Sequence, residues 1–119
     1  MNSIMIVGKM RFAKASNSVV FPNILKMRTN ELELERMCRN YARALGWVCC
    51  KLEKNAHKGI PDDLFISPSQ ECFLIEFKKD EKQKPRPEQA VWLARFSKIA
   101  FLVGSFEQFC RTLKLPPYN

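Results

Sequence analysis

The chain has 119 residues, a length that suits one domain and leaves little room for a second. Hydrophobic residues make up 46% of it, enough for one packed core without disulfides to hold it. Lys and Arg number 20 against 12 Asp and Glu, and the formal charge of +8 favours a polyanionic partner, nucleic acid first and a membrane surface second. Charge that serves only solubility is a third interpretation, and composition does not choose among them.

The five cysteines indicate a reducing compartment rather than a disulfide scaffold. Their number is odd, no two form a Cys-x-x-Cys pair, and the adjacent Cys49 and Cys50 are poorly placed for a shared disulfide or zinc ion. We expect all five to be small buried hydrophobic residues. No secretory signal and no apolar run as long as a membrane span is visible, so we expect a soluble chain, cytoplasmic or, in a host with a nucleus, nuclear.

The chain divides near residue 28. We expect residues 1–28 to form an N-terminal extension that is partly ordered at best, and residues 29–119 to form the domain. Thr29 or Asn30 is a suitable N-cap for a helix, and apolar residues at helical spacing continue up to Gly46, which ends it.

Six further elements are expected after this helix. Apolar alternation, with proline and glycine at loop positions, locates them. In chain order they are strands at 47–52, 63–66 and 72–78, a helix at 88–98, a strand at 99–103 and a helix at 106–113. The order helix-strand-strand-strand-helix-strand-helix predicts an α/β fold with a mixed central sheet of about four strands flanked by helices.

Three charged residues stand at one end of two apolar strands. Asp62 lies at the start of the first strand, and Glu76 and Lys78 lie at the end of the second. In a hairpin the start of one strand lies beside the end of the next, so we expect Asp62 and Glu76 to be neighbours. Glu76 and Lys78 are two residues apart and share one face of the sheet, whereas Phe77 between them points into the core.

Charge at this position of an apolar hairpin needs a reason. Two neighbouring carboxylates repel each other unless a cation lies between them, and oxygen ligands with open positions suit Mg²⁺ or Mn²⁺. The Phe77 carbonyl could supply a further oxygen. The plainer alternative is an ion pair of Lys78 with Glu76 or Asp62, which would be preferred for an isolated Glu-x-Lys but less so for the complete set.

These residues resemble the VRR-NUC family of the PD-(D/E)XK nuclease superfamily, which has a restriction-endonuclease-like core. The resemblance covers the chain from about Asn30 to Leu113. Each piece is a weak signal by itself, but all of them in order over one compact domain make a strong one. The segments that carry it are Gly59-Ile60-Pro61-Asp62-Asp63, Glu76-Phe77-Lys78, and Arg86-Pro87-Glu88-Gln89 followed by Trp92.

The resemblance implies a metal-dependent DNA endonuclease that hydrolyses phosphodiester bonds, and it leaves open a preference for branched or nicked DNA. Its cofactor would be Mg²⁺, with Mn²⁺ as a substitute. Asp62 and Glu76 would bind the metal, together with the Phe77 carbonyl. Lys78 would position the attacking water and stabilise charge on the phosphate, and Gln89 would orient Lys78 or the water.

Two assignments stay open within this resemblance. The first helix usually offers a glutamate to the metal, and both Glu35, which we favour, and Glu31 lie on one helical face. Asp63 stands where the family usually has an aliphatic or basic residue, which leaves it open whether Asp62 or Asp63 binds the metal. Strand alternation allows only one of them to share the face of Glu76, and the position after proline favours Asp62.

Further basic residues flank the expected site. They could bind phosphates on both sides of the scissile bond, although a solvated charged loop is the commoner role of such residues. The nucleic-acid-binding candidates are Lys54, Lys58, Lys79, Lys82, Lys84 and Arg86.

Two other functions compete with the nuclease. A catalytically inactive nucleic-acid-binding module on the same fold fits the charge, but such a module needs no acidic groups that face a polyanion. A protein-interaction domain with incidental basic charge is the other. The family also suggests a homodimer that cuts both strands of a branched duplex, and DNA is the expected partner in either arrangement.

Overall fold

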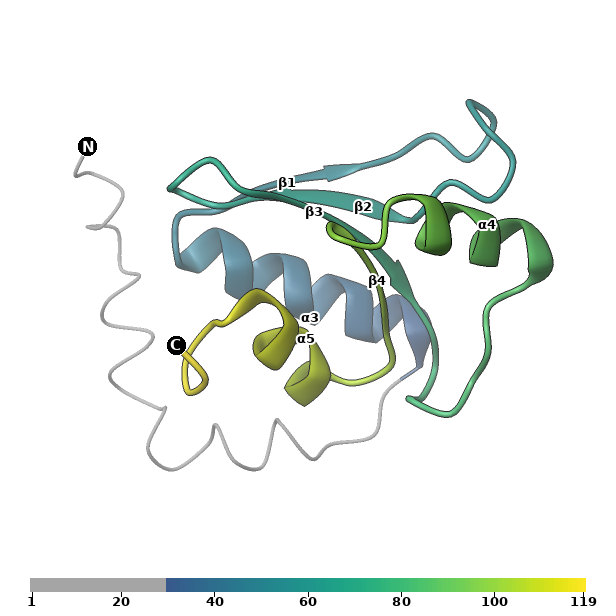
Figure 1. Ribbon diagram of the computed structural model, residues 1–119. Helices are drawn as coiled ribbons and strands as arrows, with labels where there is room; N and C mark the ends of the chain where they lie inside the picture. Colours follow the sequence, from purple (N-terminus) through teal and green to yellow (C-terminus); the bar gives the residue numbers. More distant parts are fainter. Residues whose placement is uncertain (1–29) are drawn as a thin grey trace.

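The computed structural model describes residues 30–119, so our expectations for residues 1–28 and for Thr29 lie outside the described part. Seven elements follow one another in the predicted order (Figure 1). They are α3 (Glu31–Ala44), β1 (Val48–Lys51), β2 (Asp63–Ile66), β3 (Cys72–Phe77), α4 (Pro87–Arg95), β4 (Ala100–Val103) and α5 (Phe106–Leu113).

Helix α3 has the boundaries that its sequence predicts. Asn30 is the N-cap, and its side chain accepts a hydrogen bond of 2.8 Å from the Glu33 N–H group. The helix ends at Ala44, and Gly46 follows with φ of 90°, a conformation that favours glycine. Its buried apolar residues recur at helical spacing and face the sheet.

The four strands form one mixed sheet in the order β1-β2-β3-β4, which confirms the predicted fold class. β1 pairs with β2 and β2 with β3 in antiparallel fashion, and β3 pairs with β4 in parallel. The last pair is parallel because the chain crosses over through α4 between these strands. Within the hairpin, Asp63 lies opposite Ile75, so the preceding Asp62 lies beside the end of β3.

Helices cover the two faces of the sheet unequally. α3 and α5 lie together on one face (Figure 1). Phe77 points to this face, where its ring lies 6.3 Å from that of Phe109 in α5. The neighbouring residues Glu76 and Lys78 point to the opposite face, where α4 supplies Gln89 as their partner.

The core lies between the sheet and the α3–α5 layer. Phe65 of β2 packs against Phe77 and Phe109, with ring centroids 6.4 Å and 5.1 Å away. Leu34 of α3 and Val103 of β4 are buried in the same cluster. This aromatic cluster supports the back of β2 and β3 directly behind the end of the hairpin that carries the charged residues.

Our expectation that every cysteine is buried is wrong for two of the five. Cys38 and Cys110 are buried and Cys49 is half-buried, but Cys50 and Cys72 are exposed, and all five are free thiols. Cys50 lies on the edge strand β1 and faces away from α3 and α5, where α4 does not reach. The apolar sequence around these residues does not show which face of the sheet a helix covers.

Several boundaries differ from prediction by one to three residues, and the largest difference lies where α4 leads into β4. α4 ends at Arg95 rather than at residue 98, and β4 begins at Ala100 rather than at residue 99. The segment between them is a tight turn in which the N–H groups of Ile99 and Ala100 both donate to the Phe96 carbonyl. Apolar residues in this turn resemble a continued helix or strand in the sequence.

Two leucines of α3 test the packing of this layer. Leu34 is 1% exposed and Leu32 is 74% exposed, although they lie two residues apart in one helix. We expect Leu34→Ala to lower the free energy of unfolding by about 2–5 kcal/mol because it leaves a cavity in the core. Leu32→Ala, measured beside it by urea denaturation, should change it by no more than about 0.5 kcal/mol. Equal losses would contradict the described orientation of α3.

Candidate active site

Asp62 and Glu76 lie at the same end of the β2–β3 hairpin, as the sequence predicts. Oδ2 of Asp62 accepts a hydrogen bond of 2.8 Å from the Phe77 N–H group, which fixes this carboxylate beside the end of β3. Pro61 before it is fully buried, which restricts the backbone that leads into β2. Glu76 is 5% exposed. The hairpin therefore holds two carboxylates on the face away from the aromatic core.

A chain of hydrogen bonds joins Glu76 to Lys78 through Gln89. Nε2 of Gln89 donates to Oε2 of Glu76 at 2.8 Å, and Nζ of Lys78 donates to Oε1 of Gln89 at 2.8 Å. The same Oε1 accepts from the Arg86 N–H group at 3.0 Å, so the start of α4 orients the amide. The side chains of Glu76, Lys78 and Gln89 are all buried. Nζ of Lys78 also forms an ion pair with Oε2 of Glu76 at 3.7 Å, so the amide bridges two charged groups that face each other directly.

Lys54 lies between the two carboxylates. Its Nζ is 2.9 Å from Oδ1 of Asp62, 3.3 Å from Oε1 of Glu76 and 2.9 Å from the carbonyl oxygen of Ile60. The sequence marks Lys54 only as one of several basic residues that could bind a phosphate. Local sequence does not distinguish it from Lys58, because its contacts depend on how the loop after β1 folds back over the hairpin.

The electrostatics of the pair favour a bound cation. Burial raises the pKa of Glu76, and the negative charge of Asp62 raises it further, while Lys54 and Lys78 lower it in part. Burial works against the charged form of Lys54, but its bonds to Asp62 and Glu76 outweigh this effect and raise its pKa. Two carboxylates so close together, one of them buried, are stabilised by positive charge placed between them.

The predicted third carboxylate is not brought to this pair. Glu35 of α3 lies instead in a second cluster, where its Oε2 is 2.6 Å from Nζ of Lys51 and 3.1 Å from a guanidinium nitrogen of Arg39. Arg39 also reaches Asp63 at 3.2 Å. Glu31 is exposed in the first turn of the helix. The helix offers its glutamate to the opposite face of the sheet, because α3 and α4 cover different faces.

Asp62 and Asp63 take the two faces as alternation predicts, and Asp63 belongs to the second cluster. Asp63 is fully buried, and its Oδ2 accepts from no N–H or O–H group within residues 30–119. Burial and a hydrogen bond to the negatively charged Glu35 raise its pKa to about 8. Burial alone would raise the pKa of Glu35, but its bonds to Asp63 and Lys51 lower it. The carboxylate of Glu35 therefore favours the protonated form of Asp63.

The pair formed by Asp62 and Glu76 fits a magnesium ion that retains part of its water shell. Within residues 30–119 no three Asp, Glu, His or Cys side chains converge to form a complete protein ligand set. Mg²⁺ is commonly bound by only one or two carboxylates and keeps several waters. The donor chemistry therefore agrees with such an ion, whereas a closed four-ligand zinc site does not fit. The role of the Phe77 carbonyl as a ligand stays a prediction.

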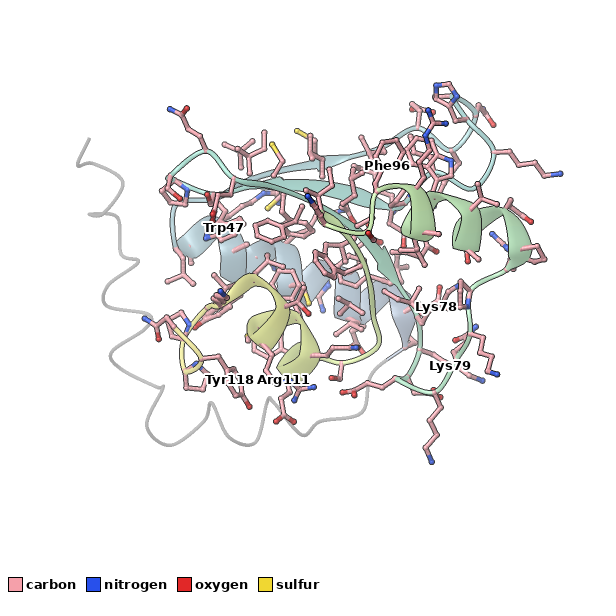
Figure 2. The ribbon with its side chains drawn as sticks, viewed as in Figure 1. Trp47, Lys78, Lys79, Phe96, Arg111 and Tyr118 are labelled. Atoms are coloured by element: carbon pink, nitrogen blue, oxygen red, sulfur yellow. The ribbon has the colours of Figure 1, made fainter. Side chains whose placement is uncertain are left out.

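The remaining basic candidates surround this site at the surface. Lys58 lies in the loop after β1, where its carbonyl oxygen accepts a hydrogen bond from the Trp92 indole of α4. The other four follow β3, and in Figure 2 Lys79 lies next to Lys78 where that strand leads into a loop. Unlike the buried Lys78, all five are exposed: Lys58, Lys79, Lys82, Lys84 and Arg86.

Comparison with known proteins identifies the family of the chain. A solved structure described as a VRR_NUC domain is 35% identical to this chain, with a TM-score of 0.66, and the match covers 72% of this chain and 96% of that one. The chain belongs to the VRR-NUC family. No protein-family model and no curated protein matched it. VRR-NUC domains are nuclease domains, so the family level of the predicted function is confirmed.

One further finding concerns membranes. In the part of this VRR-NUC chain that the structure describes, no helix is both long enough and apolar enough to span a bilayer. The roles of individual residues are not decided by family membership, and we treat them below as proposals.

Removal of the Gln89 amide tests the hydrogen-bonded chain of this VRR-NUC domain. Gln89 is 2% exposed and is the partner of both Glu76 and Lys78. We expect Gln89→Ala to lower the free energy of unfolding by about 1–3 kcal/mol, because buried polar groups lose their partners. Gln83→Ala, in the loop before α4, is the control for urea denaturation. If Gln89→Ala were as stable as that control, the hydrogen bonds of Gln89 would contribute nothing to the stability of the fold.

The pH dependence of stability tests the proton on Asp63. The folded chain keeps this proton up to a pKa of about 8, whereas the unfolded chain loses it near 3.8. The stability that protonated Asp63 contributes to the fold is therefore complete below pH 3.8. It is lost as pH rises through about 8. We expect the free energy of unfolding of Asp63→Asn, measured in EDTA, not to decline over this pH range as that of wild type does. Asp80→Asn, at an exposed position, is the control. Parallel curves for wild type and Asp63→Asn would contradict the assignment.

Proposed function

We propose that this VRR-NUC chain is a metal-dependent DNA endonuclease whose site is formed by Asp62, Glu76, Lys78 and Gln89. The observation that carries the proposal is the buried chain from Glu76 through Gln89 to Lys78. Lys78 and Glu76 form an ion pair of 3.7 Å, and the Gln89 amide binds both charged groups as well. The two hydrogen bonds of the amide hold the ammonium and the carboxylate in fixed positions, which an ion pair alone does not do.

This arrangement leaves Lys78 able to act on a substrate. An ammonium group has three N–H groups, and the contacts described for Nζ are one hydrogen bond to Gln89 and a distance of 3.7 Å to Glu76. The others can donate to a water or to a non-bridging phosphate oxygen. Because the strand and the amide hold the ammonium in place, it can stabilise charge that develops on the phosphate without prior rearrangement.

Asp62 and Glu76 are the residues that would hold the cation, for which we propose Mg²⁺ with Mn²⁺ as a substitute. When bound, such an ion acidifies a coordinated water and offsets charge on the scissile phosphate. The protein keeps both carboxylates in place through the Phe77 N–H group and the Gln89 amide. Hydrolysis by water needs no covalent intermediate. His57 lies 5.9 Å from the Trp92 ring, measured between centroids, and we assign it no catalytic role.

DNA is the substrate that the charge distribution supports. The exposed basic residues Lys58 and Lys79 lie on the two loops that flank the site, and Lys82, Lys84 and Arg86 continue the second loop towards α4. Such residues bind phosphates and fix the register of a duplex without reading its sequence. A preference for branched or nicked DNA, and the homodimer that would cut both strands of a branched duplex, stay predictions from the family.

Cleavage assays test the proposal directly. Supercoiled plasmid and a labelled four-way junction are incubated with the protein in Mg²⁺, in Mn²⁺ and in EDTA. We expect cutting with either metal and none in EDTA. Lys78→Ala and Asp62→Asn should each slow cleavage by about 100-fold or more, the effect of removing one group that stabilises the transition state. Lys98→Ala, an exposed lysine beyond α4, should cut as wild type does.

The outcomes separate the competing functions. Cutting that needs metal and is lost in both site variants supports the nuclease, and the preferred substrate then shows whether branched DNA is recognised. DNA binding without cutting under any metal would replace the proposal with the inactive binding module. No affinity for DNA at low salt would favour the protein-interaction domain.

A further inference from the structure

We propose that Lys54 is an internal counter-ion, which occupies the cation position between Asp62 and Glu76 in the metal-free chain, yields it to the divalent cation, and then binds a DNA phosphate. This inference rests on the proposed metal site and extends it to a residue that the proposed mechanism does not use. It gives Lys54 a role distinct from that of the five other basic residues around the site.

The contacts of Nζ are those that a hard cation would make. One carboxylate oxygen of Asp62, one of Glu76 and the carbonyl oxygen of Ile60 surround it at 2.9, 3.3 and 2.9 Å. All three are oxygen donors of the kind that Mg²⁺ and Mn²⁺ prefer. A divalent ion that binds both carboxylates therefore needs the oxygen atoms that the ammonium holds, so the two cations compete.

The position of Lys54 allows it to leave. Its side chain is 46% exposed, whereas that of Lys78 is 7% exposed. Lys54 stands in the loop between β1 and β2, on a flexible side chain of four methylene groups, whereas Lys78 directly follows β3 and is bonded to the buried Gln89. The site therefore contains one ammonium that is held in place and one that can move towards solvent without disturbing a strand.

The carboxylates explain why such a residue is needed without metal. Asp62 and Glu76 repel each other, and Glu76 is almost fully removed from water. An ammonium between them stabilises the metal-free fold. A divalent ion supplies more charge to the same oxygen atoms, and the released ammonium then lies beside the place that a bound phosphate would occupy. Metal binding would thus add one phosphate contact to the DNA interface.

Metal affinity measured at one pH tests the competition. Mn²⁺ binding is followed by electron paramagnetic resonance and calorimetry for wild type and for Lys54→Met, which keeps a long apolar side chain but removes the charge. We expect Lys54→Met to bind Mn²⁺ roughly 5- to 150-fold more tightly, the typical range of coupling between two linked ligands. It should also unfold at a lower temperature than wild type in EDTA, with the difference reduced or reversed by Mn²⁺.

Lys58→Met is the matched control for the metal titration, since it removes the same charge from the same loop four residues away. Its Mn²⁺ affinity should stay close to that of wild type. An equal gain in Mn²⁺ affinity in both variants would mean that the loss of any positive charge from the loop has this effect, and it would overturn the competition. Mn²⁺ binding by Lys54→Met that is no tighter than that of wild type would also overturn it. Absence of Mn²⁺ binding in every protein would overturn the proposed metal site itself.

A second measurement tests where the ammonium goes and does not depend on cleavage. DNA affinity is measured over a range of salt concentrations, in EDTA and in Ca²⁺. Transfer of Lys54 to a phosphate predicts that Ca²⁺ makes the slope of log K against log salt steeper in wild type than in Lys54→Met, by about 0.9. The same change of slope in both proteins would overturn the transfer. If Lys54→Met fails to fold in EDTA, Lys54→Gln serves in its place for both measurements.

Discussion

The antiparallel pairing of β2 with β3 is the constraint on which the rest of the site depends. The register that places Asp63 opposite Ile75 brings Asp62 to the end of β3, where the Phe77 N–H group binds its carboxylate. A shift of one residue would exchange the faces of the sheet and separate Asp62 from Glu76. The aromatic core behind the hairpin resists such a shift, because Phe65 and Phe77 would then leave their buried positions.

Strand alternation at this hairpin produces two separate charge clusters in one small domain. On the α4 face, Asp62 and the buried Glu76 share a half-exposed lysine. On the α3 face, Asp63 and Glu35 are buried between Arg39 and Lys51. The acidic groups of the first cluster contact a lysine that can leave them, while Glu35 and Asp63 of the second are paired with Arg39 and Lys51. Neighbouring aspartates thus have different partners, because a single peptide step moves them to opposite faces of the sheet.

The two lysines of the site differ in burial and in how firmly the fold holds them. Lys78 is buried, follows a central strand and is oriented by Gln89 at the start of α4. Lys54 is half-exposed and belongs to a loop that folds over the hairpin. A rigid ammonium suits the stabilisation of a transition state, whereas a mobile one suits the exchange of counter-ions. The loop reaches the site because Gly59, with φ of 80°, allows its backbone to pass directly against that of Glu88.

The sequence by itself determined the order of elements, the end of the first helix before Gly46, and the shared face of Glu76 and Lys78, because each depends on neighbouring residues and on strand periodicity. It narrowed the N-cap to Thr29 or Asn30, and the structure shows Asn30. Family resemblance added Gln89, whose partners lie 11 and 13 residues away. Only the tertiary structure decided that Glu35 joins Lys51 and Asp63, and that Lys54 rather than another lysine enters the site. These partners depend on which face each helix covers and on how a loop folds back, which no local pattern records.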